Sequence, residues 1–443
     1  MTARELALNA LQQVDAGKKS GNVLHDLLGN ASLERHDRAL VTELVNGVFR
    51  RRLTLDAVIA ACYHHRYEKT APVMKNILRM GAYQLLWLDR IPKWAAVSES
   101  VALARKYKGE RMSRLVNALL RKIDPGSALQ VAVQKETSEI RRLAVATSHP
   151  EWLIERWIDR YGTDQTGAML DYNNRTPLTG FRINTLKTTP DDFASAHDPQ
   201  KHIRKAAGLD DFFLSEEFTL FETFVRQGLL TVQNPTQGLC CRLCNPNRGA
   251  LVLDLCAAPG GKATYLGELM QNAGSITAVD LYGAKLEKLT RHAAELGISI
   301  ITTVAADART FQPGAKPDII LLDAPCSGSG VLARRAELRW KISPSMLAEL
   351  VSLQAEILDH AASLLGADGI LVYATCSIEP EENERQIDAF LGRHPEFTRD
   401  PLAGIVPEPF DASASENGSI LMLPGQETGF DGGFAQRLKK NAD

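Results

Sequence analysis

Apolar side chains in the first 125 residues recur with the spacing of α-helices. The stripes consist of Leu6, Leu11 and Val14, then Val41, Leu44, Val45 and Val48, then Ile77, Met80, Leu85 and Leu86. Positions three and four residues apart share one face of a helix, so each stripe predicts a helix that packs against the others. We predict an all-α bundle over residues 1–125, ended by the turn-forming run Asp124-Pro-Gly-Ser127.

Residues 126–235 contain segments with helical spacing of apolar residues and segments with strand-like spacing. Residues 152–161 have a helical pattern, residues 180–184 indicate a short strand, and the polar run 190–199 indicates a loop. We predict a linker followed by a small α+β domain.

From residue 236 the pattern alternates between strands and helices. The predicted strands are 251–255, 275–279, 300–304, 318–322 and 369–373, and the predicted helices include 346–365 and 381–391. This alternation is typical of a doubly wound, mostly parallel sheet. We predict an α/β domain over residues 236–443, with residues 419–423 and 434–438 as an antiparallel pair near its end.

Composition narrows the class of protein. The 443 residues are 44% hydrophobic and 23% charged, as in soluble proteins of several domains. The first residues lack the apolar core of a signal peptide, and no apolar run approaches the ~18 residues of a membrane span. We expect a cytoplasmic monomer that does not contact membranes. The seven cysteines should then be free thiols.

The formal net charge of −2 conceals an asymmetry along the chain. Residues 1–125 hold 21 Lys and Arg against 12 Asp and Glu, a net charge of +9, and the remaining residues hold 30 against 41, a net charge of −11. A basic domain favours a polyanionic partner such as RNA, although a solvated helical surface would give the same count. The candidate contacts here are Arg105, Lys106 and Lys108.

A run of small residues follows the first strand of the α/β domain. Pro259 restricts the turn, and Gly260 and Gly261 let backbone amides approach a ligand. The helix that begins near Lys262 would point its amide groups at a ligand carboxylate. The spacing is not the G-x-G-x-x-G of dinucleotide-binding proteins. We predict that a nucleotide-like cofactor binds to Cys256, Ala257, Ala258, Pro259, Gly260, Gly261 and Lys262.

Three carboxylates follow successive strands of the same domain. Ligands of an open α/β sheet bind beyond the carboxyl ends of the strands. We therefore expect Asp280 to bind ribose hydroxyls, Asp307 to accept from an adenine amino group, and Asp323 to lie beside both cofactor and substrate. Each of them alone is more often a cap or turn residue.

Two cysteines also end strands: Cys326 in Asp323-Ala-Pro-Cys and Cys376 in Ala374-Thr-Cys. A thiolate that adds to carbon 6 of cytosine makes carbon 5 nucleophilic, so carbon 5 can take the methyl group of a sulfonium before the thiolate leaves. Asp323 could hydrogen-bond N3 and the amino group of the base. An isolated cysteine is more often a small buried hydrophobe. With the cofactor loop, however, Cys376, Cys326 and Asp323 predict a pyrimidine methyltransferase that uses S-adenosylmethionine.

These segments carry a resemblance. The chain resembles the family of RNA cytosine-5 methyltransferases that includes the bacterial Sun and nucleolar Nop proteins. The segments that carry this resemblance are Val252–Lys262, Asp323–Gly330 and Thr375-Cys-Ser, with Glu382-Asn383 after them. Residues Ile77–Leu86, Val97–Ala104 and Val116–Leu120 resemble the NusB fold, a helical RNA-binding domain. Together the two resemblances cover nearly the whole chain.

The resemblance implies a class I, Rossmann-like methyltransferase fold, with 16S ribosomal RNA as substrate, as naked RNA or within an assembling small subunit. It implies that Cys376 is the nucleophile and that Cys326 assists release of the methylated RNA. It also implies that Cys256–Lys262, Asp280, Asp307 and Asp323 contact the cofactor or the base. Asn234 and Gly433 depart from the usual family pattern.

Other interpretations stay open at this point. Another RNA such as tRNA is an alternative substrate, and a non-catalytic RNA-binding or antitermination-type factor is an alternative function. A DNA cytosine-5 methyltransferase is a third possibility, although the second thiol and the NusB-like domain argue against it. Cys241-x-x-Cys244 lacks a second ligand pair at metal-site spacing, so we predict no metal and a helix packed under the cofactor loop. Arg334, Arg335 and Arg339 are further predicted RNA contacts.

Overall fold

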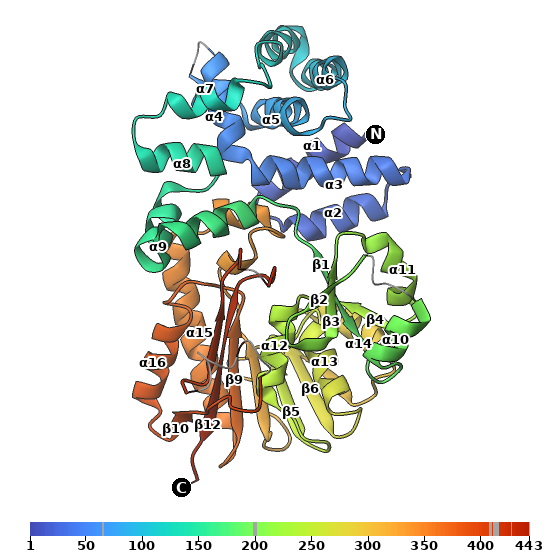
Figure 1. Cartoon of the computed structure of the whole chain (residues 1–443), viewed down its shortest axis with the longest axis vertical. Coiled ribbons are helices and arrows are strands. Elements are labelled where there is room, and N and C mark those ends of the chain that lie inside the picture. The colour runs from blue at the N-terminus through green and yellow to red at the C-terminus, as the bar shows by residue number, and fades with distance from the viewer. Residues whose placement is uncertain (64–65, 198–201, 407–409, 411–415, 427, 443) are drawn as a thin grey trace. The chain divides into compact units, whose positions relative to one another are not determined.

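The structure is a computed structural model that describes residues 1–63, 66–197, 202–406, 410, 416–426 and 428–442 (Figure 1). The chain forms two compact units. Unit 1 comprises Met1–Arg175 and Leu332–Lys341, and unit 2 comprises Thr176–Val331 and Ile342–Asp443. The domain boundaries placed at residues 125 and 235 from the sequence stay predictions.

Unit 1 is helical. Its elements are α1 (Ala3–Asp15), α2 (Ser20–Gly29), α3 (Arg35–Arg50), α4 (Arg52–Cys62), the 3-10 helix η1 (Tyr67–Lys69), α5 (Pro72–Trp87), α6 (Lys93–Leu120), α7 (Ala128–Gln134), α8 (Glu139–Thr147), α9 (Glu151–Asn173) and η4 (Ala336–Trp340).

The apolar stripes predicted from the sequence form the core of unit 1. Leu11, Val45 and Ile77 each have no exposed surface. In α5, a side chain at Gly81 would have its Cβ 2.5 Å from Leu120, so glycine allows α5 and α6 to approach closely. Helix α6 is interrupted at Gly109, whose φ of 79° is non-helical.

A short segment from far along the chain, Leu332–Lys341, belongs to unit 1. The side chain of Arg339 is fully buried in it and donates hydrogen bonds to the main-chain oxygens of Arg50 (3.2 Å), Ser148 (3.1 Å) and Asn173 (2.9 Å). The prediction that Arg339 contacts RNA is therefore wrong. The guanidinium instead satisfies carbonyl groups that burial would leave without partners.

Unit 2 contains two sheets. Its elements are β1 (Thr179–Ile183), α10 (Pro190–His197), β2 (Arg204–Ala206), β3 (Leu209–Ser215), α11 (Phe218–Arg226), β4 (Leu230–Val232), α12 (Pro235–Cys244), β5 (Leu251–Leu255), α13 (Gly261–Leu269), β6 (Ser275–Asp280), α14 (Gly283–Leu296), β7 (Ile301–Ala305), β8 (Ile319–Asp323), η3 (Ser329–Val331), α15 (Pro344–Leu364), β9 (Ile370–Thr375), α16 (Glu384–Arg393), β10 (Phe397–Arg399), β11 (Ser419–Met422) and β12 (Gly433–Lys440).

The smaller sheet is antiparallel, in the order β2-β3-β1-β4. Phe181 of β1 lies opposite Phe213 of β3, and their rings stack with centroids 5.1 Å apart. Helix α10 is a correction, because the run 190–199 was predicted to be a loop. Proline suits the first position of a helix, and the hydroxyl of Thr189 accepts from the amide of Asp192 at 3.1 Å as a cap. Residues 198 and 199 lie outside the described residues.

The larger sheet has the order β10-β12-β9-β8-β5-β6-β7, with β11 paired to β12. Strands β5 to β9 pair in parallel, and β12 runs antiparallel to β9. The predicted antiparallel pair at the end of the chain is confirmed by β11 and β12, where Leu421 lies opposite Phe434. From β5 the chain adds β6 and β7 on one side and β8 and β9 on the other, which makes β5 and β8 the switch point where ligands of such sheets bind.

Alternate residues of the strands pack on opposite faces of this sheet. Val252 and Leu321 face a core with α12 and α13, whereas Leu253 and Ile320 face a core with α15 and α16. This two-sided burial explains the nearly continuous apolar runs of the parallel strands. The predicted fold class is confirmed: a helical bundle, a small α+β domain and a doubly wound α/β domain. No helix in the described part of the chain has the length and apolarity that crossing a membrane requires.

Candidate active site

The loop Cys256–Gly260 joins β5 to α13 at the carboxyl edge of the large sheet. Gly260 has φ 105°, and a Cβ on it would lie 2.4 Å from Leu289, so this turn requires glycine. Arg182 anchors the next residue by donating to the carbonyl oxygen of Gly261 at 3.0 Å. The first amides of α13 have no intrahelical acceptor, which makes this helix start suited to an anionic group.

Lys262, the next residue, is paired with Asp323. Its Nζ lies 2.6 Å from Asp323 Oδ2. Burial alone would lower the pKa of Lys262, but attraction to Asp323 outweighs it and the pKa is raised. Lys262 is therefore cationic and held against the carboxylate that was predicted to touch the base. Its predicted contact with a cofactor carboxylate stays a prediction.

Two further carboxylates lie beside the loop. Asp280, at the end of β6, accepts from the amides of Ala258 (3.2 Å) and Tyr282 (3.0 Å). Asp254, in β5, is fully buried, and neither of its oxygens has a hydrogen-bond partner among the described residues. Burial first, and repulsion by Asp323 second, raise the pKa of Asp254. An unpartnered buried carboxyl group indicates that a polar ligand completes the site, and the donor-bearing amino-acid and ribose parts of S-adenosylmethionine fit it.

Two apolar side chains directly after Asp280 were missed in the sequence. Leu281 is 62% exposed and Tyr282 is 58% exposed, at the edge of the sheet where β6 ends. Large exposed apolar side chains at a binding edge suit the flat ring of an adenine. In the sequence, these two residues could have been recognised by their position immediately after Asp280, the acid that ends a predicted strand.

Asp307 follows β7, as predicted. Its carboxylate is held by Arg309, whose Nη2 lies 2.7 Å from Oδ2, and this pairing lowers the pKa of Asp307 to about 2. Asp307 is thus an ionised acceptor at the right strand end. Its contact with adenine stays a prediction.

The two thiols lie side by side. Cys326 follows β8 and Cys376 follows β9, and these adjacent parallel strands pair Asp323 with Ala374 near their ends. The two sulfur atoms are 3.1 Å apart, and the amide of Cys376 donates to Cys326 Sγ at 3.3 Å. The hydrogen bond with Cys376 and then burial raise the pKa of the Cys326 thiol well above its usual value. Cys326 therefore keeps its proton, and either sulfur can be the donor in the contact between the two thiols.

Cys376 lines a narrow hollow of about 20 Å³, together with Lys262, Asn234, Thr375 and Asp431. Cys326 is not among the described residues that line this hollow. Both thiols are half-buried, and Cys376 is the one that shares this hollow with Lys262. Asn234 has a local role here as well, because its side chain accepts from the amide of Thr236 at 2.9 Å and caps α12 without needing a charge.

A buried carboxylate, Glu382, holds the Cys326 loop. Glu382 Oε1 accepts from the amide of Ser327 (2.8 Å) and from Gln354 Nε2 (3.0 Å), and Oε2 accepts from the Ser327 hydroxyl (2.5 Å). The carbonyl oxygen of Glu382 accepts from Tyr373 in β9 at 2.7 Å. Residue 382 thus ties the loop after β8 to the strand that carries Cys376.

The remaining predicted RNA contacts are Arg105, Lys106, Lys108, Arg334 and Arg335. Arg105 pairs with Glu110 at 2.7 Å, and Lys106 pairs with Glu5 at 2.6 Å. These exposed pairs are weak and exchange readily for phosphate. All five residues stay predicted contacts.

The cysteines of α12 are buried, as predicted for a helix packed under the cofactor loop. Cys240, Cys241 and Cys244 are at most 5% exposed, and Cys241 Sγ lies 3.7 Å from the carbonyl oxygen of Lys262. Burial first raises the pKa of each of these thiols. They act as core residues.

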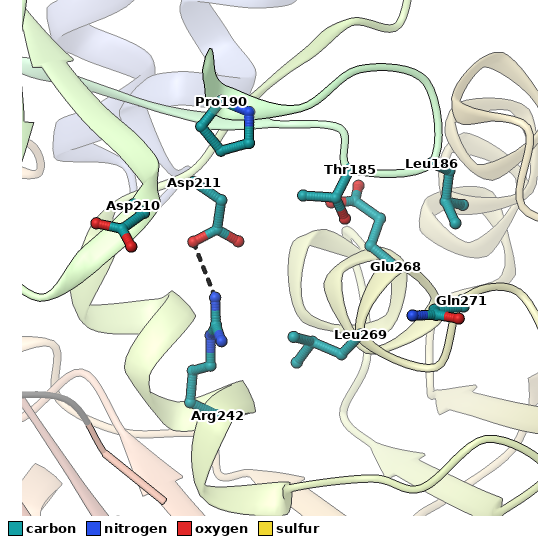
Figure 2. Close-up of a pocket in the computed structure, with 9 residues that line it drawn as sticks. All are labelled: Thr185, Leu186, Pro190, Asp210, Asp211, Arg242, Glu268, Leu269 and Gln271. Atoms are coloured by element: carbon teal, nitrogen blue, oxygen red, sulfur yellow. Dashed lines mark hydrogen bonds and ion pairs between the residues drawn. The ribbon is translucent and has the colours of Figure 1, made fainter. Parts of the chain in front are cut away.

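A larger hollow of about 520 Å³ lies where the small sheet meets α12 and α13 (Figure 2). Asp211 points toward Arg242, with 3.0 Å between the charged atoms, and Glu268 pairs with the buried Arg182 at 2.8 Å. Because these charges are paired within the protein, we assign no ligand to this hollow.

Comparison with known proteins agrees with this geometry. A family model described as 16S rRNA methyltransferase RsmB/F matches residues 241–439, the NusB family matches residues 1–125, and an RsmF/B-like ferredoxin-like domain matches residues 149–198.

Relatives match the chain over its length. A protein of Bacillus subtilis named probable ribosomal RNA small subunit methyltransferase B is 32% identical over 99% of both chains. A protein of Synechocystis with the same name is 34% identical over 99% of this chain and 100% of its own. The crystal structure of PH0851 superposes with a TM-score of 0.81, at 26% identity over 99% of both chains. The resemblance predicted from the sequence is thus confirmed, and the chain belongs to the RsmB/F family of S-adenosylmethionine-dependent rRNA methyltransferases.

Proposed function

We propose that this chain makes 5-methylcytosine in 16S ribosomal RNA, with Cys376 as the nucleophile. The observation that carries the proposal is the pair of free thiols, 3.1 Å apart, at the ends of adjacent parallel strands beside the cofactor loop. The names of the relatives support the small-subunit RNA as substrate. Unlike the buried thiols of α12, these two are half-buried at the ligand-binding edge of the sheet, and pyrimidine chemistry uses one thiol to attack and benefits from a second.

Cys376 starts the reaction. Its sulfur, as thiolate, adds to carbon 6 of cytosine, and the electron pair of the C5–C6 double bond becomes available at carbon 5. Asp323, paired with Lys262, accepts from the amino group of the base, and in its protonated form it would also donate to N3 and stabilise the charge that develops there. When bound, S-adenosylmethionine supplies an electrophilic methyl group, which carbon 5 takes.

Cys326 completes the reaction. Once Cys376 is a neutral thioether, the hydrogen bond that raised the pKa of Cys326 most is weakened, and Cys326 releases its own proton to solvent. Its thiolate then accepts the proton of carbon 5. The C–H electrons re-form the double bond, the bond between Cys376 and carbon 6 breaks, and methylated RNA is released.

The cofactor is held by the chain's own polar groups. We assign its amino-acid part to the loop Cys256–Lys262, beside which the buried carboxyl of Asp254 has no hydrogen-bond partner in the part of the chain that the structure describes. Asp280 is assigned to the ribose and Asp307 to the adenine, with Leu281 against the ring.

The target base must leave its stack to reach the thiol. The hollow beside Cys376 holds about one water molecule, so the side chains that line it must separate to admit a base. We expect the reaction in the cytoplasm, on naked RNA or on an assembling small subunit.

The proposal is tested by incubating the purified chain with S-adenosylmethionine and 16S ribosomal RNA from a strain that lacks the gene, followed by bisulfite sequencing. We expect one protected cytosine that a Cys376→Ala variant does not produce. Methylation of tRNA but not of 16S RNA would reject the substrate, and no methylation of either RNA, naked or in assembling subunits, would reject the activity.

A further inference from the structure

Unit 1 carries a groove of about 730 Å³ between the two parts of α6, on either side of the break at Gly109. Trp94, Val97 and Val101 line it, at positions i, i+3 and i+7 of one helical face. The core side of the same helical part is a different set of buried residues: Ala96, Ser100, Leu103 and Ala104. Val97 and Val101 also pack in part against the core of the bundle, so the groove is formed by the outer, accessible part of this face.

Trp94 dominates this face. Its side chain is 74% exposed, whereas Val97 and Val101 beside it are half-buried. A single exposed apolar residue is common on protein surfaces. Here, however, the exposed indole lies beside the half-buried side chains of Val97 and Val101. A flat ring can therefore stack on the indole and pack against these apolar side chains.

The rim of the groove is basic. Lys93, Arg105 and Arg121 are exposed around it. Lys93 forms no ion pair within the described part of the chain. Arg105 forms an exposed pair with Glu110, and Arg121 donates to the side chain of Asn117 at 3.1 Å. Such solvent-exposed contacts are readily exchanged for phosphate oxygens.

We infer that this groove binds an unstacked nucleotide of single-stranded RNA, with the base on Trp94 and the flanking phosphates on Lys93, Arg105 and Arg121. The occupant follows from the combination of a flat aromatic surface with a cationic rim, because every base has a face that stacks and every nucleotide carries a phosphate. A duplex offers no free base face, so the groove selects unpaired RNA. The inference rests on the proposed function, in which the substrate is ribosomal RNA, and it adds a second contact point on unit 1.

The test measures binding of a short, fluorescein-labelled single-stranded RNA by the full-length chain, using fluorescence anisotropy. Trp94→Ala should weaken binding by roughly tenfold, the value of one lost stacked base, and Trp94→Phe should restore most of it. Heparin, which has charge but no bases, should bind wild type and Trp94→Ala equally. Removing Lys93 and Arg121 should reduce the salt dependence, since each lost phosphate contact lowers the slope by about one.

A matched control lies on the same helix. Tyr107 is an exposed aromatic residue of α6 that does not line the groove. Tyr107→Ala should leave the affinity unchanged. Equal losses in Tyr107→Ala and Trp94→Ala, or an unchanged affinity in Trp94→Ala, would overturn the inference. So would a loss confined to assembling subunits and absent with naked RNA, since the occupant would then be a protein.

Methyl transfer separates this inference from the proposed function. In the same preparations, Trp94→Ala should raise the KM for 16S RNA and leave kcat unchanged. If wild type methylates 16S RNA and Trp94→Ala has the same KM, the groove is rejected and the function stands. If wild type neither binds nor methylates 16S RNA, the proposed function itself is rejected.

Discussion

The sulfur atoms of Cys326 and Cys376 lie 3.1 Å apart, although 50 residues separate them in the chain. The sheet accounts for this proximity, because β8 and β9 are adjacent and parallel and their carboxyl ends meet at one edge. Around the pair, Glu382 fixes the loop of Cys326 and Lys262 holds Asp323. The predictions below follow from these contacts and from the buried groups of unit 1.

Glu382 positions the Cys326 loop. Glu382→Gln removes a carboxylate that accepts from the amide and hydroxyl of Ser327, and such charge-assisted bonds contribute about 1.5–3 kcal/mol each. We expect kcat to fall by about tenfold to a hundredfold, with little change in the KM for RNA, and the covalent complex to persist longer in single-turnover assays. The matched control is Glu381→Gln, a neighbour whose partner is the exposed Arg385. Unchanged turnover in Glu382→Gln would contradict the positioning role.

Arg339 stabilises unit 1 from within. Arg339→Ala leaves the carbonyl oxygens of Arg50, Ser148 and Asn173 buried without this donor, at about 1 kcal/mol or more each. We expect the free energy of unfolding of unit 1 to fall by about 3 kcal/mol, as measured by urea denaturation. Arg335→Ala, at a half-buried neighbouring position, should change stability little. A variant Arg339→Ala of normal stability with weakened, less salt-dependent RNA binding would restore the RNA contact that we rejected.

His149 makes unit 1 sensitive to acid. Burial first, and repulsion by Arg339 second, hold the pKa of His149 well below its ordinary value of about 6.5, and Arg51 adds to the repulsion. Below about pH 6.5 the unfolded chain binds a proton that the folded chain does not, so the stability present above that pH is lost as the pH falls. The loss should approach about 1.4 kcal/mol per pH unit for this one group.

The measurement is unfolding of unit 1 between about pH 7.5 and about pH 5.5. As the pH falls, the free energy of unfolding of His149→Gln should decrease less steeply than that of wild type, whatever the stability of the variant at neutral pH. His36→Gln is the comparison variant, because it removes an imidazole whose side chain is 74% exposed. Equal slopes in wild type and His149→Gln would refute the assignment.

The sequence was sufficient for the parts of the site that follow from strand order. Asp323 ends β8, and Cys326 and Cys376 follow β8 and β9, so the rule that ligands bind at the carboxyl edge predicts that the three lie together. Glu382 illustrates what the sequence could not specify: its partner Ser327 lies 55 residues away, and only the packed loops bring them into contact. The motif Glu382-Asn383 was visible beside the Cys376 loop, but the sequence did not show that Glu382 accepts from Ser327 of the Cys326 loop.

Arg339 and the helix α10 show two further limits. Arg339 stands in a basic, aromatic run that is typical of a nucleic-acid surface, yet tertiary packing buries it among carbonyl groups. Helix α10 was missed because its residues are polar, and only the proline and the Thr189 cap marked its start. Local composition predicted an exposed side chain for Arg339 and a loop for residues 190–199. Contacts with residues far along the chain bury Arg339, and the capping hydrogen bond of Thr189 marks the start of α10.

The central claim concerns which thiol bonds to RNA, and trapping the covalent complex tests it most directly. Cys326→Ala and Cys376→Ala would each be mixed with 16S RNA and S-adenosylmethionine, and the protein resolved on a denaturing gel with nuclease-treated controls. We predict a persistent protein–RNA adduct with Cys326→Ala, because attack proceeds but release does not, and neither adduct nor methylation with Cys376→Ala. An adduct that forms without Cys376 would assign the attack to Cys326 and contradict the account.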